Sequence, residues 1–267
     1  MRLYRAGVTY YLKIHQNDPD LPFLVLMHGF MGSGEVFEPL ISDLSKFSNP
    51  VTIDLCGHGK TVTPSEPSRF ETTEQVEDLK SILERLQFSD LYLYGYSMGG
   101  RLALQYTVNY PGNLKGLILE STHCGISDSA ERKKRRETDQ KRAEEIRINF
   151  PDFLDEWMKM PLFRSSDNEM YESVMQKQNP ELMAASLLGF GAGEMPSICD
   201  KLEQITTKSL LIAGSEDQKY VEKMSEMAHL IDHAKLEIVQ LAGHRVHSDK
   251  PGKFVKIINQ FISEDYG

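Results

Sequence analysis

The chain has 267 residues, and its 30 Lys and Arg against 39 Asp and Glu give a formal net charge of −9. Apolar residues make up 40% of the sequence and charged residues 26%, which is typical of a folded globular chain. The acidic balance excludes a general binder of nucleic acids or anionic membranes, because both need a basic face. No apolar run approaches the roughly 20 residues of a membrane span, and no signal-peptide core follows the N-terminus.

The three cysteines, at positions 56, 124 and 199, form an odd and widely spaced set without a C-x-x-C motif. This pattern predicts neither a disulfide framework nor a zinc site. We therefore expect a cytoplasmic protein without a bound metal. At about 100–200 residues per domain, the length predicts one large domain or a core with an insertion.

The first half of the chain alternates between short apolar runs and helical segments. The apolar runs lie at residues 23–27, 51–53, 91–94 and 117–119. Between the second and third runs, residues 71–86 carry apolar side chains at three- and four-residue spacing, which predicts a helix. Continuous apolar runs separated by helices are typical of a mostly parallel central sheet flanked by helices on both faces.

The character of the sequence changes after residue 122. Residues 127–188 carry charges, Met and helix-forming residues, without an apolar run of strand type. Strand-like runs return at 209–213 and 236–240, and an amphipathic helix closes the chain. These patterns predict an α/β fold with a helical lid insertion. The core is assigned to residues 1–125 and 199–267, and the cap, or lid, to residues 126–198.

Residues 95–100, Gly-Tyr-Ser-Met-Gly-Gly, contain a G-x-S-x-G motif. They directly follow the predicted strand at 91–94 and directly precede a helical stretch at 101–108. In this context the motif forms a tight turn that exposes the serine hydroxyl at the end of a strand. The pattern predicts Ser97 as the reactive residue, with the amide of Met98 facing the reactants. An ordinary glycine-rich turn is the plainer alternative.

A serine needs a base, and the base needs an acid that orients it. His244 lies just beyond the last predicted strand, and Asp217 follows the strand at 209–213. The order Ser97, Asp217, His244 is that of the α/β-hydrolase fold and differs from the orders of the serine proteases. Glu120 is the rival acid, ranked below Asp217, and His247 is a candidate neighbour of the site.

The loop at residues 28–34, His-Gly-Phe-Met-Gly-Ser-Gly, follows the first predicted strand of the parallel sheet. In α/β-hydrolases this loop supplies the second backbone donor of the oxyanion hole, here the amide of Phe30 beside that of Met98. The loop is rich in glycine but contains neither GxxxxGK[ST] nor GxGxxG, so it does not predict a nucleotide site. We expect no cofactor.

Several cations exceed what a plain esterase needs. Arg101 lies four residues after Ser97 on the predicted helix, where it requires either a salt bridge to a core carboxylate or a bound anion. Residues 131–136, Glu-Arg-Lys-Lys-Arg-Arg, form a basic cluster at the start of the cap. Most of these charges are expected in solvent, but two that face inward would bind a substrate carrying carboxylates. Trp157, the only tryptophan, is a candidate pocket wall.

These residues together resemble one family of α/β-hydrolases, the 2-succinyl-6-hydroxy-2,4-cyclohexadiene-1-carboxylate synthases of menaquinone biosynthesis. The similarity runs over nearly the whole chain. The motifs that carry it are the loop at 28–33, the elbow at 95–101, Glu-Ser-Thr-His at 120–123, the pattern Arg132-x-x-Arg135-x-x-x-Asp139, and Ala-Gly-His-Arg-Val-His at 242–247.

The resemblance implies a lyase that eliminates pyruvate from 2-succinyl-5-enolpyruvyl-6-hydroxy-3-cyclohexene-1-carboxylate, without metal or cofactor. It implies a catalytic triad of Ser97, Asp217 and His244. The implied substrate-binding residues are Arg101 and Arg135 for carboxylates, Tyr96 and Trp157 for the pocket wall, and Lys177. Lys177 replaces a lid arginine of some members, which keeps the charge but loses the bidentate fork.

Two other functions stay open at this point. A carboxylesterase or carbon–carbon bond hydrolase would use the same triad but would not need Arg101 or Arg135. A non-catalytic binding protein on this fold would not need all three triad residues. We expect a small multi-carboxylate substrate, no nucleic-acid or membrane partner, and a monomer or small homo-oligomer.

Overall fold

A central β-sheet organises the protein. The computed structural model describes residues 1–88, 90–163 and 169–264. Within these ranges the sheet has eight strands, β1 (Arg2–Arg5), β2 (Val8–Ile14), β3 (Phe23–Met27), β4 (Asn49–Asp54), β5 (Leu91–Tyr96), β6 (Gly116–Glu120), β7 (Ser209–Gly214) and β8 (Ala234–Val239). Their order is β1-β2-β4-β3-β5-β6-β7-β8. Every pairing from β4 to β8 is parallel, which confirms the mostly parallel sheet.

Helices cover both faces of this sheet. They are α1 (Glu38–Leu44), α2 (Thr72–Leu86), α3 (Met98–Asn109), α8 (Gln218–Leu230) and α10 (Pro251–Ser263). Tyr94 of β5 packs in the apolar cluster that includes α1 and α10, whereas its neighbour Leu93 packs in the cluster that includes α2, α3 and α8. Because side chains alternate along a strand and both faces are buried, the central strands read as continuous apolar runs.

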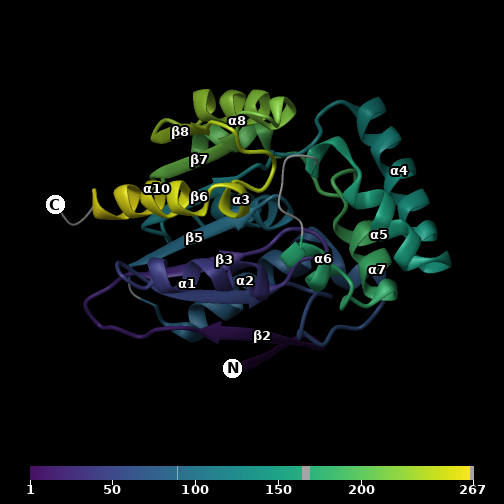
Figure 1. Cartoon of the computed structure of the whole chain (residues 1–267), viewed down its shortest axis with the longest axis horizontal. Coiled ribbons are helices and arrows are strands. Elements are labelled where there is room, and N and C mark those ends of the chain that lie inside the picture. The colour runs from purple at the N-terminus through teal and green to yellow at the C-terminus, as the bar shows by residue number, and fades with distance from the viewer. Residues whose placement is uncertain (89, 164–168, 265–267) are drawn as a thin grey trace.

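The segment between β6 and β7 contains residues 126–198, the predicted cap. Its helices are α4 (Ser129–Ile148), α5 (Phe150–Met158), α6 (Glu169–Met175) and α7 (Pro180–Phe190). They gather at one end of the sheet, on the right of Figure 1. Residues 164–168 of the predicted cap lie outside the described residues. No helix in the described ranges is long and apolar enough to cross a membrane.

Short helical turns complete the fold and hold the cap against the core. They are η1 (Gly34–Phe37), η2 (Pro67–Phe70), η3 (Pro161–Phe163), η4 (Cys199–Gln204) and α9 (Val246–Asp249). α4 packs along α7, and α7 in turn contacts η2 of the core. At that contact a Cβ on Gly189 would lie only 2.2 Å from the carbonyl oxygen of Pro67, so the close approach requires glycine.

The strands β1 and β2 were not predicted from the sequence. They pair with each other and with β4 in antiparallel fashion at one edge of the sheet. β1 is exposed or half-exposed along its whole length, and Tyr4 is 63% exposed. An edge strand of this kind lacks the continuous apolar run by which the buried strands were recognised.

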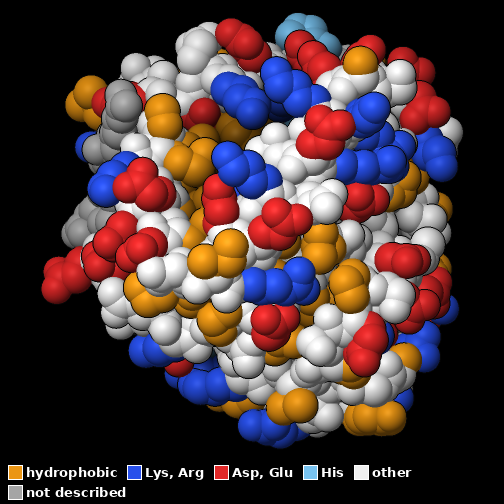
Figure 2. Space-filling model, turned by 90° about the vertical axis from the view of Figure 1, so that its right-hand side faces the viewer, with side chains coloured by type: hydrophobic (Ala, Val, Ile, Leu, Met, Phe, Trp, Pro, Cys, Tyr) orange, Lys and Arg blue, Asp and Glu red, His pale blue; other side chains and the backbone are white. Residues whose placement is uncertain are grey.

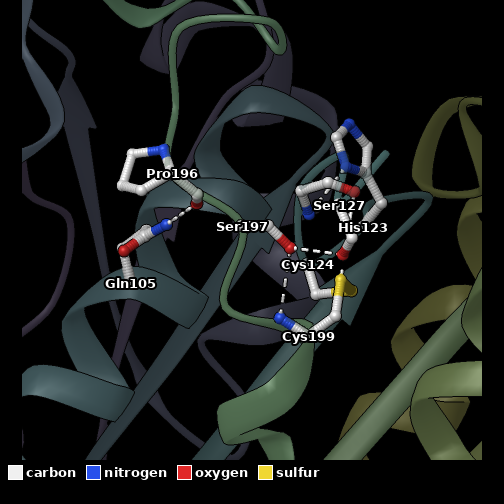
Figure 3. Close-up of a disulfide and its surroundings, with 8 residues drawn as sticks. Gln105, His123, Cys124, Ser127, Pro196, Ser197 and Cys199 are labelled. Carbon is white, nitrogen blue, oxygen red and sulfur yellow. Dashed lines mark hydrogen bonds between the residues drawn. A yellow bond between two sulfur atoms is a disulfide. The ribbon is translucent and has the colours of Figure 1, made fainter. Parts of the chain in front are cut away.

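A disulfide joins the two ends of the cap, contrary to the prediction from the cysteine pattern. Cys124 follows β6 and Cys199 opens η4, and their Cα atoms lie 5.0 Å apart although 75 positions separate them. The hydroxyls of Ser127 and Ser197 meet beside the disulfide at 2.8 Å (Figure 3). The prediction was wrong because the cap leaves and re-enters the core at neighbouring points, which sequence spacing does not reveal. Cys56 is a free buried thiol, and burial raises its pKa to about 12.

Candidate active site

Ser97 occupies the tight turn between β5 and α3. Its backbone has φ 51° and ψ −105°, a conformation that is strained for any residue with a side chain. A Cβ on Gly95 would lie 2.5 Å from the carbonyl oxygen of Gly99, and one on Gly99 would lie 2.5 Å from that of Met27. The two glycines of the motif are therefore required, and the turn lifts the Ser97 hydroxyl to the end of the sheet.

Three loops at the carboxyl ends of the parallel strands bring Ser97, Asp217 and His244 together. The Nε2 atom of His244 lies 3.2 Å from the hydroxyl oxygen of Ser97, and its Nδ1 atom lies 2.6 Å from a carboxylate oxygen of Asp217. Both the imidazole and the carboxylate are buried. Burial lowers the pKa of His244, while Asp217 acts in the opposite direction. A neutral imidazole in this position can accept the serine proton.

The amides of Phe30 and Met98 are the predicted oxyanion donors, and both residues border the cavity that contains Ser97. Phe30 lies in the loop after β3, and Met98 is the first residue of α3, whose N-terminal amides have no acceptor within the helix. Neither amide N–H has an acceptor among the residues that the structure describes. Both residues line the same cavity as Ser97. The arrangement can donate two hydrogen bonds to one negatively charged oxygen, with support from the α3 dipole.

A cavity of about 440 Å³ lies between the core and the cap. Its floor carries the triad, and its cap side is aromatic, with the ring of Trp157 5.6 Å from that of Phe30 and 6.0 Å from that of Phe163. On the face formed by the cap, Lys and Arg side chains gather in the upper part beside a hollow that shows hydrophobic side chains (Figure 2). The predicted site residues that line the cavity are Phe30, Tyr96, Ser97, Met98, Arg101, Arg135, Trp157, Asp217 and His244.

Arg101 is buried at this cavity without a carboxylate partner among the described residues. Its guanidinium donates to the carbonyl oxygen of Phe190 at 3.0 Å and lies 5.0 Å from the Phe190 ring. Burial, together with the positive charge of Arg135, lowers the pKa of Arg101 to about 10. Of the two possibilities left by the sequence, the salt bridge to a core carboxylate is not formed within the described part of the chain. The charge therefore favours a bound anion.

Arg135 is the cation of the basic cluster that reaches the cavity. Its Nε atom lies 2.9 Å from both carboxylate oxygens of the buried Asp139 on the next turn of α4. Arg132 and Arg136 instead donate to the carbonyl oxygen of Gly193, each at 3.0 Å. Those two arginines join α4 to the segment around Gly193, near the end of the cap, whereas Arg135 faces the cavity.

Comparisons with known proteins agree with this geometry. Residues 22–158 match the alpha/beta hydrolase fold family. A Bacillus subtilis (strain 168) protein provisionally named 2-succinyl-6-hydroxy-2,4-cyclohexadiene-1-carboxylate synthase is 36% identical over 90% of both chains. The synthase of that name from Yersinia pestis bv. Antiqua (strain Nepal516) is 27% identical, over 91% of this chain and 88% of its own. The structure of MenH from S. aureus has a TM-score of 0.90 and 31% identity, covering 97% of this chain and 99% of that one. The chain belongs to this synthase family.

The side chain of Lys177, a predicted substrate-binding residue, does not line the cavity. Its ammonium group lies 3.1 Å from a carboxylate oxygen of Glu35, and its side chain is 62% exposed. The neighbouring Gln178 points inward instead and bonds the backbone of Gly32 and Gly59. The structure therefore does not bring Lys177 to the cavity with the other predicted site residues, because the chain turns its side chain to the surface just after α6.

Sequence reasoning missed several residues that line the cavity, namely Arg142, Phe163, Tyr171, Lys219, Tyr220 and Arg245. A signal was present for some of them. Arg142 lies seven positions after Arg135 on α4 and shares its helix face. Lys219 lies two positions after Asp217, so any loop that presents this carboxylate brings the lysine near. The aromatic residues of the cap gave no such signal, because their spacing is also that of an ordinary packed helix.

Glu120, the rival acid, belongs to a separate buried network. Its carboxylate lies 2.7 Å from Nδ1 of His247 and accepts a hydrogen bond from Tyr94 at 2.7 Å. The other ring nitrogen of His247 bonds the hydroxyl of Tyr171 in the cap helix α6. The ranking of Asp217 above Glu120 as the partner of His244 is therefore confirmed, and His247 links the core to the cap.

The described residues of the site offer side chains and backbone amides for chemistry. Within the described ranges, no group of three or more His, Cys, Asp or Glu residues could hold a metal ion. What the arrangement can do is transfer a proton through Ser97 and His244, stabilise one developing oxyanion, and hold negatively charged groups near Arg101 and Arg135.

Proposed function

We propose that this chain catalyses the reaction of its family, the elimination of pyruvate from 2-succinyl-5-enolpyruvyl-6-hydroxy-3-cyclohexene-1-carboxylate to give 2-succinyl-6-hydroxy-2,4-cyclohexadiene-1-carboxylate. The observation that carries the proposal is the buried guanidinium of Arg101, which has no carboxylate partner among the described residues, in the same cavity as Ser97 and His244. A buried cation without an acid is costly, so it indicates a substrate that is itself an anion. The relatives named above support this reading.

The two chemical names define the bonds that change. The ring double bond at C3 is replaced by double bonds at C2 and C4, so a proton leaves C2 and the enolpyruvyl oxygen leaves C5. C2 also carries the ketone of the succinyl group, so loss of its proton places negative charge on that ketone oxygen. The reaction therefore needs a base near C2, donors for the developing oxyanion, and cations for the carboxylates.

The site offers one residue or group for each of these needs. His244, held by Asp217, accepts the proton of the Ser97 hydroxyl, and the serine oxygen then removes the C2 proton. The amides of Phe30 and Met98 stabilise the ketone oxygen. As the double bonds shift, the C5–O bond breaks, and the enolpyruvate takes up a proton from the imidazolium and tautomerises to pyruvate. General-base transfer typically contributes about 10²–10⁴-fold, and one oxyanion donor about 10²–10³-fold.

Arg101 and Arg135 are proposed to bind carboxylates of the substrate, and Tyr96 and Trp157 to form the wall against which the ring packs. Holding a substrate by several charges fixes C2 relative to the serine oxygen, which lowers the entropic part of the barrier. No cofactor enters this scheme. A cytoplasmic location and a monomer or small homo-oligomer complete the proposal, since a small charged substrate does not cross membranes unaided.

A carboxylesterase or carbon–carbon bond hydrolase remains the alternative that the triad alone would favour equally. The direct test supplies the cyclohexene substrate to the purified protein and follows pyruvate with lactate dehydrogenase. We expect pyruvate and the cyclohexadiene to form in equal amounts. Short p-nitrophenyl esters, assayed in parallel, should turn over slowly or not at all. Rapid ester turnover without pyruvate release would replace the synthase by an esterase.

A further inference from the structure

The proposed substrate carries three carboxylates, one on the succinyl chain, one on the enolpyruvyl group and one on the ring. The inference that follows rests on the proposed function. Arg101 and Arg135 provide cavity cations for two of these groups. Lys177, which replaces a lid arginine of some family members, instead pairs with Glu35 at the surface. A third cation of the cavity is therefore needed if each carboxylate is to be held.

Arg142 stands where such a cation is needed. It lies on α4, three positions after Asp139 and seven after Arg135, so all three share one face of the helix. Arg142 lines the cavity, and its side chain is 23% exposed. Its guanidinium carbon lies 5.2 Å from the ring centre of Trp157, also a cavity residue. Stacking on an aromatic face fixes a guanidinium while its N–H groups stay available for a carboxylate.

Among the described residues, two arginines on this face of α4 contact one buried carboxylate. Asp139 is the acid shared by the two arginines, at 2.9 Å from Nε of Arg135 and 3.7 Å from a terminal nitrogen of Arg142. One carboxylate cannot neutralise both, and Arg101 adds a third positive charge. Burial lowers the pKa of Arg142, and the charge of Arg135 lowers it further. The same two causes act on Arg101.

We propose that Arg142 binds the third carboxylate of the substrate, with Trp157 holding its guanidinium in place. Arg142 thereby takes the role that the sequence predicted for Lys177. Two cations from the cap and Arg101 from the core then surround the substrate, so the pocket selects tricarboxylates over dicarboxylates. Among the described residues, Arg245 and Lys219 also line the cavity. The guanidinium of Arg245 packs between the rings of Phe163 and Tyr171, 4.1 Å and 3.8 Å from their centres, whereas Lys219 is exposed and is the competing candidate for this role.

Trp157 makes the proposal measurable without turnover, because it is the single tryptophan of the chain and lies at the cavity. Its fluorescence can be titrated with citrate as a tricarboxylate probe and with succinate as a dicarboxylate probe. We expect Arg142→Leu to weaken citrate binding by about tenfold or more, the usual effect of losing one charge-assisted contact. Succinate binding should change far less. Arg142→Lys keeps the charge but loses the bidentate fork and the stacking. Its affinity for citrate should lie between those of the wild type and Arg142→Leu.

Lys177→Leu is the matched control, since it removes one positive charge from the cap away from the cavity. It should leave citrate binding within about twofold, because exposed charges act weakly through solvent. Thermal melting of each variant reports whether it is folded. Unchanged citrate binding in folded Arg142→Leu would overturn the proposal, as would an equal loss in the control. A loss in Lys219→Leu but not in Arg142→Leu would transfer the role to Lys219.

The same variants separate this inference from the proposed function. With the cyclohexene substrate, Arg142→Leu should raise KM much more than it lowers kcat, because the contact is present in both ground and transition states. If no pyruvate forms but citrate binding still depends on Arg142, the proposed reaction fails and the tricarboxylate subsite stands. If pyruvate forms and Arg142→Leu leaves both KM and citrate binding unchanged, the reaction stands and the subsite fails.

Discussion

The core and the cap contribute to the site in different ways. In the core, Ser97, Asp217 and His244 each lie on a loop directly after a strand of the parallel sheet, so the sheet itself sets their separation. In the cap, Arg135 and Trp157 project from helices with largely exposed outer faces. The difference teaches that the groups proposed to react lie on the parallel sheet of the core, while several of the groups proposed to recognise substrate lie on the inserted part. Arg101 and Tyr96 are the substrate-binding residues proposed on the core side.

Burial follows the same division. Strands β5 and β7 are buried along their whole length, whereas three of the 20 residues of α4 are buried. Substitutions in the cap should therefore change substrate binding with little effect on folding. Substitutions at the core positions that touch the reacting atoms should stop the chemistry. Five measurements test this division, beginning with the largest expected effect.

The largest effect is expected for Ser97→Ala. The substitution removes the oxygen that takes the C2 proton, so pyruvate release should fall by roughly 10⁴-fold or more. Citrate titration of Trp157 fluorescence should be unchanged, because the cations remain in place. Residual activity within tenfold of the wild type would show that the serine is not the base. It would also contradict the assignment of the reacting groups to the core.

Arg101→Met should reduce kcat/KM by about 10²-fold or more, the usual cost of removing one member of a buried charged contact. Its melting temperature, in contrast, should equal or exceed that of the wild type, because the substitution removes a buried charge with no acid to balance it among the described residues. Steady-state kinetics and thermal melting measure the two effects. A marked fall in melting temperature with unchanged kinetics would make Arg101 a structural residue.

The pH dependence tests how the core keeps His244 neutral. Burial lowers the pKa of His244, Asp217 raises it, and the charge of Arg245 lowers it. The acid limb of kcat/KM should therefore lie below pH 6.5, the ordinary value for histidine. Arg245→Met should move this limb to higher pH. Arg245 also lies 4.1 Å from the ring centre of Phe163 in the cap, so such a shift would show that a residue contacting the cap tunes the base.

The stability of the folded state should follow the same pKa with a defined sign. A histidine whose pKa is lowered on folding binds fewer protons than it does in the unfolded chain. Its contribution to the free energy of unfolding is therefore lost as the pH falls below about 6.5. Denaturant titrations between neutral and mildly acidic pH measure this slope. His244→Gln, which does not titrate, should show a smaller slope.

The smallest effect is expected for Lys177→Ala. The lysine forms an exposed pair with Glu35, and such pairs stabilise proteins by about 0–1 kcal/mol. Both kcat and KM should stay within about twofold of the wild type. A tenfold rise in KM would restore Lys177 to the substrate site and would mean that the segment after α6 turns inward when substrate binds.

The fold was predictable wherever burial on both faces of the sheet left continuous apolar runs. Residues 91–94 and 209–213 are such runs, and they became β5 and β7. The edge strand β1 was missed because exposure interrupts its apolar pattern. The disulfide between Cys124 and Cys199 was missed because it depends on where the cap re-enters the core, which is a property of the folded chain.

The candidate site was predictable where local geometry determines position. The strained turn at Ser97 needs its glycines, and the positions after β7 and β8 bring Asp217 and His244 to one end of the sheet. The cap was harder to predict, because the direction of a side chain on an inserted helix depends on packing. Lys177 faced outward and Arg142 faced inward, and both outcomes follow from how α4 and the segment after α6 sit on the core.

The 5.0 Å between the Cα atoms of Cys124 and Cys199 also makes the cap a replaceable module. All three triad residues lie outside the interval between these cysteines, and the core strands β6 and β7 that flank it pair directly with each other. An insert of different length could therefore start and end at these positions without moving the triad, provided that its own ends lie about as close together. New substrate pockets could then be built over one unchanged reacting centre, by exchange of a single continuous segment.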